Sequence, residues 1–297
     1  MPGPLTAERL LTAWTFEPLP AAAAVLAGVL YLLGVRRLRA RGVGWSPWRT
    51  YAFVGVGLGS MLLATQSALA TYDSVLLWVH MVQHMVLSMV VPIFLALGAP
   101  LTLALRTVGP GPRRLLLAVL HSRVAALLTF PVVTGLVFVA NPFLLYFSPL
   151  YEATLRHEWL HDLNHVHFVL VGSLWFWSVL GLDPMPRRVP YGLRLLAVFA
   201  TLPFHAFLGV AIMGASTVLA QDWYSSLART WGPTLLDDQR TAGGILWATG
   251  DLIGLVVFAI LFVQWSRASG REAEREDRRL DRLEGQAAVR SRQASGR

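Results

Sequence analysis

The sequence contains no cysteine and no lysine, and charged side chains of any kind are scarce. The missing cysteine excludes disulfides, thiolate metal sites, iron–sulfur clusters and cysteine nucleophiles. Charged residues make up 14% of the 297-residue chain, whereas about a quarter is usual in a soluble domain. Because 55% of the residues are hydrophobic and the mean hydropathy is +0.54, lipid rather than water is expected to surround most of the chain.

Long apolar runs alternate with short polar segments along the chain. Crossing the hydrocarbon of a bilayer takes about 20 apolar residues in a helix, and membrane helices tolerate the glycines and prolines found in these runs. The first run lacks a basic lead-in, so no cleavable signal peptide is expected. We therefore predict an all-α membrane protein, a bundle of seven transmembrane helices at residues 18–35, 50–70, 74–98, 124–147, 159–181, 192–217 and 243–265.

The distribution of arginine predicts how this bundle is oriented. Twelve arginines fall in the loops after the first, third and fifth runs, and four fall on the opposite side. We expect the protein in the cell membrane. The positive-inside rule then places its N-terminus outside and its C-terminus in the cytoplasm. The first group is Arg36, Arg37, Arg39, Arg41, Arg49, Arg106, Arg113, Arg114, Arg123, Arg187, Arg188 and Arg194; the second is Arg9, Arg156, Arg229 and Arg240.

Three parts follow from this topology. Residues 1–17 form an extracytoplasmic N-terminal segment, 18–265 the seven-helix transmembrane domain, and 266–297 a charged cytoplasmic tail. Within the tail, residues 272–284 fit either a charged surface helix or a disordered segment. The net charge of +8 is explained by topology and by anionic lipid headgroups, so no nucleic-acid partner is expected.

Histidines are concentrated toward the outer half of the predicted bundle. His80 and His84 are four residues apart and share one side of the third run, while His161 and His165 repeat that spacing on the fifth. His205 on the sixth run lies roughly 20 Å from the inner face of a core about 30 Å thick, which is a similar level. Asp251 adds a carboxylate on the seventh run, about 12 Å below the outer face.

One small site cannot take every histidine. His167 lies two residues past His165, about 200° round the helix, so the two rings point apart. His157 is expected in a solvated loop and His121 in the headgroup layer. Imidazole pairs on facing helices are a common way to hold a metal, and without cysteine the candidate metals are copper, zinc and iron. Nearby methionines either favour Cu(I) through their thioethers or simply fill the core; they are Met81, Met85, Met89 and Met213.

Four segments of the chain resemble a known family. HMVQHMVLSMVVPIFLALGAPLTLALR at 80–106 is similar to the signature of the caa3-type cytochrome c oxidase assembly factors, the multi-span CtaG family. The matches continue in order with HVHFVLVGSLWFWSVLGLDPMP at 165–186, FHAFLGVAIMGAS at 204–216 and WGPTLLDDQRTAGGILWATGD at 231–251. The resemblance covers about residues 50–265, and it excludes the unrelated single-span copper protein of the same name, which has a cysteine pair.

The resemblance implies a membrane factor that helps to assemble haem–copper oxidase, by inference through copper supply. It matches motif histidines to His80, His84, His165, His167 and His205, and so favours His167 where helix geometry favours His161. Asp238 and Gln239 fall in its D-Q motif, where a cap that fixes the outer loop is at least as good an interpretation as a ligand role. The implied partners are cytochrome c oxidase subunits and a copper donor protein.

Three hypotheses remain open from the sequence. The leading one is a non-enzymatic assembly factor that binds copper, expected as Cu(I), and delivers it to the oxidase. The second is a seven-span membrane hydrolase that holds zinc through three histidines and Asp251. The third is a haem b electron carrier with paired ligands such as His84 and His205. The metal-site residues predicted for the first two are His80, His84, His161, His165, His167, His205 and Asp251.

Overall fold

The computed structural model describes residues 1–187 and 189–295, and side chains as far as Leu280 together with Arg282. Within these residues every regular element is a helix and none is a strand, as the sequence predicts. Arg188, one of the arginines used to predict the orientation, lies outside the described residues.

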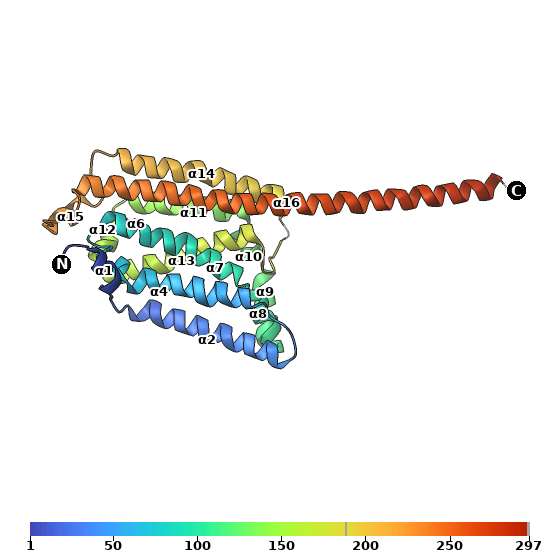
Figure 1. The fold of residues 1–297 in the computed structure, drawn as a ribbon, viewed down its shortest axis with the longest axis horizontal. Coiled ribbons are helices and arrows are strands. Elements are labelled where there is room, and N and C mark those ends of the chain that lie inside the picture. The colour runs from blue at the N-terminus through green and yellow to red at the C-terminus, as the bar shows by residue number, and fades with distance from the viewer. Residues whose placement is uncertain (188, 296–297) are drawn as a thin grey trace.

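Short helices lie at the ends of the bundle. Its length is crossed by long helices or by consecutive helical segments (Figure 1). The first nine segments are α1 (Ala7–Thr12), α2 (Pro18–Ala40), α3 (Pro47–Thr50), the π-helical η1 (Tyr51–Leu58), α4 (Gly59–Gln66), α5 (Ala68–Tyr72), α6 (Leu77–Met85), the π-helical η2 (Val86–Val90) and α7 (Val91–Leu97). The remaining nine are α8 (Pro100–Thr107), α9 (Pro110–Leu120), α10 (Arg123–Leu128), α11 (Pro131–Tyr146), α12 (Leu150–Arg156), α13 (Glu158–Leu180), α14 (Tyr191–Gly214), α15 (Gln221–Ser226) and α16 (Leu235–Ser295).

Six stretches of the described chain are long and apolar enough to cross a membrane. A seventh is reached if α11 and α12, which meet at a bend of 69°, are counted as one span. The six are Pro18–Ala40, Pro47–Tyr72, Leu77–Leu97, Glu158–Leu180, Tyr191–Gly214 and Leu235–Leu280. The protein is therefore a multi-span helical membrane protein.

The fourth predicted run, 124–147, is not one continuous helix, and that part of the prediction is wrong. Helix α10 ends at Leu128, and α11 begins at Pro131 after an extended Phe130 with ψ of 123°. Proline lacks a backbone N–H and disfavours the helical conformation in the residue before it, so the break falls where the sequence places Pro131.

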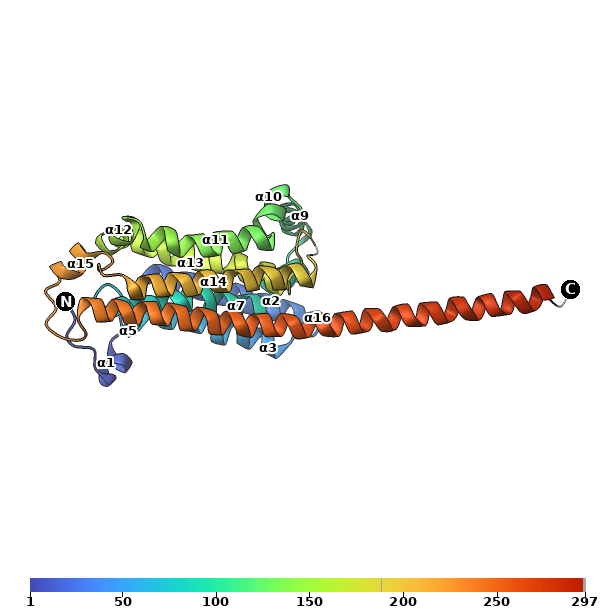
Figure 2. The same cartoon turned by 90° about the horizontal axis from the view of Figure 1, so that it is seen from above.

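Successive crossings of the bundle run in opposite directions, so the connecting segments alternate between its two ends (Figure 1). Helices α1, α12 and α15 gather at one end with the N-terminus, and we call this the N-terminal end. Helices α8 and α9 lie at the other end, from which α16 extends away from the bundle (Figures 1 and 2). Helix α16 continues through the charged tail to Ser295, so the tail is helical there.

Close backbone contacts hold the bundle together. At Gly172 of α13, a Cβ atom would collide with the carbonyl oxygen of Ser88 and lie 2.7 Å from Pro92 Cγ, so α13 rests directly on η2 and α7. Between α14 and α16, a Cβ on Gly209 would lie 2.7 Å from the Gly243 carbonyl oxygen. Small residues let membrane helices approach in this way, and dispersion contacts then stabilise the pair.

Two buried carboxylates cap helices far away in sequence. Asp238 accepts hydrogen bonds from the backbone N–H groups of Leu77 and Trp78, at 3.2 and 2.9 Å, and thereby caps the start of α6. Gln239 accepts from Leu219 N at 2.6 Å and donates to the Thr217 carbonyl oxygen at 3.0 Å, so it fixes the outer loop, and the cap interpretation of this pair is confirmed. Asp183 accepts from Thr102 N at 2.8 Å and caps α8 at the opposite end.

Gly172→Ala tests the closest of these backbone contacts. The added methyl group has to push α13 away from η2, and we expect a loss of about 1–3 kcal/mol of stability, seen as a lower melting temperature in detergent. Gly59→Ala is the matched control, because a Cβ there meets nothing within 4 Å. Equal melting temperatures for the two variants would contradict this packing.

Candidate metal centre

Four imidazoles from two helices meet inside the bundle, in the half nearer its N-terminal end. His80 and His84 project from α6, and His161 and His165 project from α13. The ring centroids are 3.8 Å apart within the first pair and 4.3 Å within the second. Across the helices, His80 lies 5.9 Å from His161, and His84 lies 6.0 Å from His165. We call these four residues the histidine cluster.

The cluster contains ring nitrogens that are buried without a partner among the described residues. His80 is fully buried and neither of its ring nitrogens makes a hydrogen bond. The Nε2 atoms of His84 and His161 are also buried without one. An unpaired polar group in an apolar interior costs several kcal/mol, so such groups are nearly always satisfied by something. Lone pairs converging from several imidazoles suit a cation, which means that the residues present fit a metal.

The tautomer of His165 is set by a relay of two hydrogen bonds. Gln83 donates from Nε2 to the Ala64 carbonyl oxygen at 3.0 Å, which turns its Oε1 toward His165. His165 Nε2 lies 3.0 Å from that Oε1 and must be the protonated nitrogen. The lone pair of His165 therefore sits on Nδ1. Outer partners of this kind orient metal-binding histidines.

A tyrosine supports His84 in a similar way. The Tyr146 hydroxyl donates to the sulfur of Met81 at 3.6 Å and lies 3.0 Å from His84 Nδ1. With its only hydrogen on the sulfur, the hydroxyl accepts from His84 Nδ1–H. This tautomer leaves the lone pair on His84 Nε2, the nitrogen without a partner.

Asp73 supplies a carboxylate that the sequence interpretation missed. Its oxygen and one nitrogen from each of His161 and His165 lie within 4.8 Å of one another, a spacing that could hold a metal ion. Asp73 Oδ2 is 3.5 Å from His161 Nε2 without hydrogen-bond geometry. Burial raises the pKa of Asp73 to about 7 even though Gln83 and Ser74 lower it, so a neighbouring cation would favour the ionised form. The sequence did offer one signal for this residue, because Asp73 directly precedes the third apolar run, which carries His80 and His84.

The structure separates His161 from His167, the two histidines between which the sequence could not decide. His161 joins the cluster, whereas His167 is exposed and lies 2.9 Å from Asn141 Oδ1 through its Nε2. This agrees with the angle between successive positions on a helix and not with the assignment that the motif favours. His121 and His157 are exposed as expected.

His205 and Asp251 are buried or half-buried elsewhere and do not reach the cluster. His205 packs on Phe138, with ring centroids 5.3 Å apart, and against Gly250 of α16. Asp251 Oδ2 accepts from Trp247 Nε1 at 2.8 Å on its own helix. Depth along the bundle was compatible with one shared site, but His205 is separated from His84 by a small cavity, and Asp251 is engaged with Trp247 on α16.

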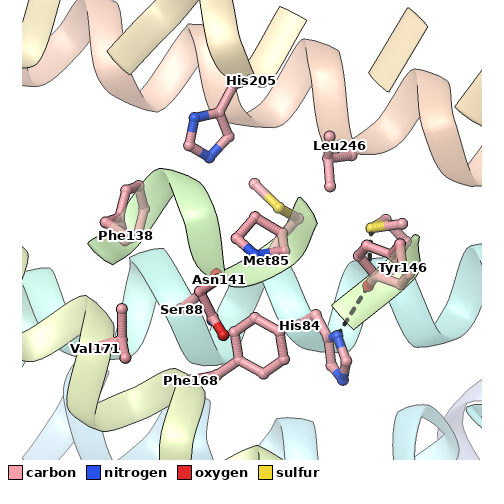
Figure 3. A pocket seen from close by; sticks show the side chains of 12 residues that line it. His84, Met85, Ser88, Phe138, Asn141, Tyr146, Phe168, Val171, His205 and Leu246 are labelled. Carbon is pink, nitrogen blue, oxygen red and sulfur yellow. Dashed lines mark hydrogen bonds between the residues drawn. The ribbon is translucent and has the colours of Figure 1, made fainter. Parts of the chain in front are cut away.

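A small cavity of about 20 Å³ is lined by His84 and His205, which lie on opposite sides of it (Figure 3). Met81 and Met85 also line it, together with Asn141 and Leu246. This volume admits about one water molecule. A porphyrin does not fit between the two rings, so the cavity gives no support to a haem held by His84 and His205.

Comparison with known proteins shows the family of the chain. The family model for the cytochrome c oxidase caa3 assembly factor (Caa3_CtaG) matches residues 29–268, most of the chain and all of the histidine cluster. The chain belongs to the caa3-type cytochrome c oxidase assembly factors. The resemblance drawn from the four sequence segments is thereby confirmed.

Curated relatives come from mycobacteria. Uncharacterized proteins of Mycobacterium bovis and Mycobacterium tuberculosis are each 39% identical to this chain over 288 residues, and one of Mycobacterium leprae is 38% identical. The match covers 95% of this chain but 43–44% of each relative, so the chain spans less than half the length of these proteins. No solved structure matches the chain.

Alanine variants of His165 and His167 test which face of α13 carries the site. Removing His165 deletes a donor from the cluster, and we expect Cu(I) affinity to fall at least tenfold. His167→Ala removes a histidine two residues away that faces Asn141, and its affinity should equal that of the wild type. Anaerobic competition with a chelator of known affinity measures the Cu(I) affinity of both variants. Equal losses of affinity would contradict a site on the His165 face of α13.

The relay through Gln83 makes a separate prediction. Gln83→Leu keeps a buried side chain of similar size but frees His165 to rotate and to change tautomer. We expect Cu(I) affinity to fall about ten- to a hundredfold, as for other outer partners of metal-binding histidines. The same competition experiment applies, with the melting temperature as the check on folding. An unchanged affinity in a folded variant would mean that the relay does not orient a ligand.

Proposed function

We propose that this assembly factor binds copper in the histidine cluster and delivers it to the cytochrome c oxidase during assembly. The family membership supports the oxidase as the destination. The observation that carries the metal assignment is His80, which is fully buried and has no hydrogen-bond partner on either ring nitrogen. The imidazoles of His84 and His161 lie 3.8 and 5.9 Å from it, and the absence of cysteine leaves imidazole and thioether as the soft donors available.

The proposal includes an orientation in the membrane. We take the bent pair α11 and α12 as one span, which gives seven spans with the N-terminus outside and the C-terminus in the cytoplasm of the cell membrane. The arginine-rich loops then lie on the cytoplasmic side, at the end where α8 and α9 are found. The histidine cluster lies toward the opposite, extracytoplasmic end, where copper would arrive from outside the cell.

The arrangement of the donors suits transfer as well as binding. Cu(I) is the cargo, and low coordination numbers allow it to be held by two or three neutral imidazoles at once. With the lone pairs of His84 on Nε2 and of His165 on Nδ1 fixed by Tyr146 and Gln83, the rings need not rotate when the ion arrives. More imidazoles than the ion needs leave a neighbouring donor free, so copper can pass from one pair to the next by ligand exchange.

A zinc hydrolase is the second candidate, and one observation favours it. Asp73, His161 and His165 form an oxygen–nitrogen donor set beside a cavity that could admit water and substrate. Catalytic zinc commonly combines histidines with one carboxylate and an open position. Zinc retained through purification, with ester or amide hydrolysis that a chelator abolishes, would favour this function over copper delivery.

Metal analysis of the purified protein tests the copper proposal. We expect wild type loaded with Cu(I) to retain copper near one ion per chain after desalting, and the double variant His80→Ala/His84→Ala to retain little. In cells, the same double variant should lower the copper content of the oxidase. The matched control is His121→Ala/His157→Ala, which removes two exposed histidines and should behave as wild type.

Two results would contradict the proposal. One is a wild type that retains no copper under anaerobic loading. The other is an oxidase with unchanged copper content in cells that carry only the folded His80→Ala/His84→Ala variant.

A further inference from the structure

A cavity of about 290 Å³ opens beside the histidine cluster at the N-terminal end of the bundle. Five parts of the chain meet around it: the segment before α2, the end of α4, α5 with the turn after it, the junction of α12 and α13, and α15. His161 and His165 line its inner side, so the cavity reaches the cluster directly. Its volume accommodates several water molecules and hence a hydrated ion.

The lining of this cavity is strongly acidic. Four carboxylates face it against one guanidinium, that of Arg156, which already pairs with Glu152 at 2.5 Å and stacks over Trp223. The four acidic residues are Glu17, Asp73, Glu158 and Asp162. Burial raises the pKa of Glu17, and the charges of Asp162 and Glu158 raise it further, as expected for carboxylates that share one field.

The position of Glu17 is fixed by the fold. Gln66 accepts from the backbone N–H of Glu17 and donates to its carbonyl oxygen, both at 2.9 Å. This pair of hydrogen bonds ties the segment before α2 to the end of α4. Because Gln66 is buried, the backbone of Glu17 is held beside the cavity, which its side chain lines.

The cluster behind the cavity points independently to a cation. His161 at the cavity wall has a buried Nε2 without a hydrogen bond, and the fully buried His80 lies behind it with both ring nitrogens unpaired. Asp73 belongs to both the cavity and the candidate donor set. Carboxylates therefore line the approach, and imidazoles stand at its end.

We propose that this acidic vestibule is the entrance through which a free copper cation reaches the histidine cluster, with Glu17, Glu158 and Asp162 attracting the ion before the imidazoles take it. The inference rests on the proposed copper function and adds its route. Carboxylate oxygens are hard ligands that hold Cu(I) weakly, so they concentrate the ion without retaining it. A cleft lined by one sign of charge raises association rates of an opposite charge and does so most at low ionic strength.

The experiment measures how fast the full chain in detergent takes up Cu(I) supplied as a free monovalent cation under anaerobic conditions. The variant Glu17→Gln/Glu158→Gln/Asp162→Asn neutralises the vestibule while sparing Asp73, which belongs to the donor set. We expect uptake about tenfold slower than wild type at low salt and the same final stoichiometry. At about 1 M salt, where the screening length is about 3 Å, the two rates should converge.

The control removes three carboxylates that do not line the cavity. Glu8→Gln/Asp222→Asn/Asp237→Asn removes the same number of negative charges from the same end of the bundle and should take up Cu(I) at the wild-type rate. The vestibule is overturned if the first variant also matches wild type at low salt, or if the control slows equally. A wild type that takes up no Cu(I) overturns the copper function itself, and the route with it.

Discussion

The candidate site depends on one cost, that of placing unpaired imidazole nitrogens inside an apolar helix bundle. In water each nitrogen would be hydrogen-bonded, and in lipid-surrounded protein each unpaired one costs several kcal/mol. His80 bears this cost on both nitrogens, and its neighbours His84 and His161 on one each. A cation shared by these lone pairs would offset the loss at once. The cluster is therefore understandable as a site completed by its cargo rather than as a set of ordinary core residues.

The scaffold around the cluster keeps the two histidine helices at a fixed distance. Gly172 brings α13 onto the backbone of η2, two turns along from His165, and Asp238 caps the first turn of α6 just before His80. Gln83 then ties α6 to both α4 and α13 through hydrogen bonds to Ala64 and His165. The helix ends and the helix contact thus determine how the four rings meet.

Much of this arrangement could be predicted from local spacing. The i, i+4 pairs on two runs place His80 beside His84 and His161 beside His165, and the angle from His165 to His167 predicts that the latter faces elsewhere. Apolar run length located six of the seven runs on stretches long enough to span a membrane, and the pair Asp238 and Gln239 could be interpreted as a cap. These features depend on neighbours within a few residues, where helix geometry is sufficient.

The features that the sequence did not predict depend on which faces of distant helices meet. Depth alone suggested that His205 and Asp251 join the site, but His205 faces His84 only across a small cavity, and Asp251 accepts a hydrogen bond from Trp247 of its own helix. Asp73 was missed because it lies in a turn between two helices, where no periodicity points inward. The break before Pro131 was missed because the prediction followed the length of the apolar run. The proline alone was sufficient to predict it.

X-ray absorption at the copper edge of the Cu(I)-loaded protein tests the central claim most directly, because it reports the atoms around the ion. The account predicts two or three nitrogen neighbours with the outer-shell scattering of imidazole rings, lost in a variant lacking His80 and His84. A first shell of sulfur or of oxygen alone, or an imidazole signal unaffected by those two substitutions, would place copper elsewhere and contradict it.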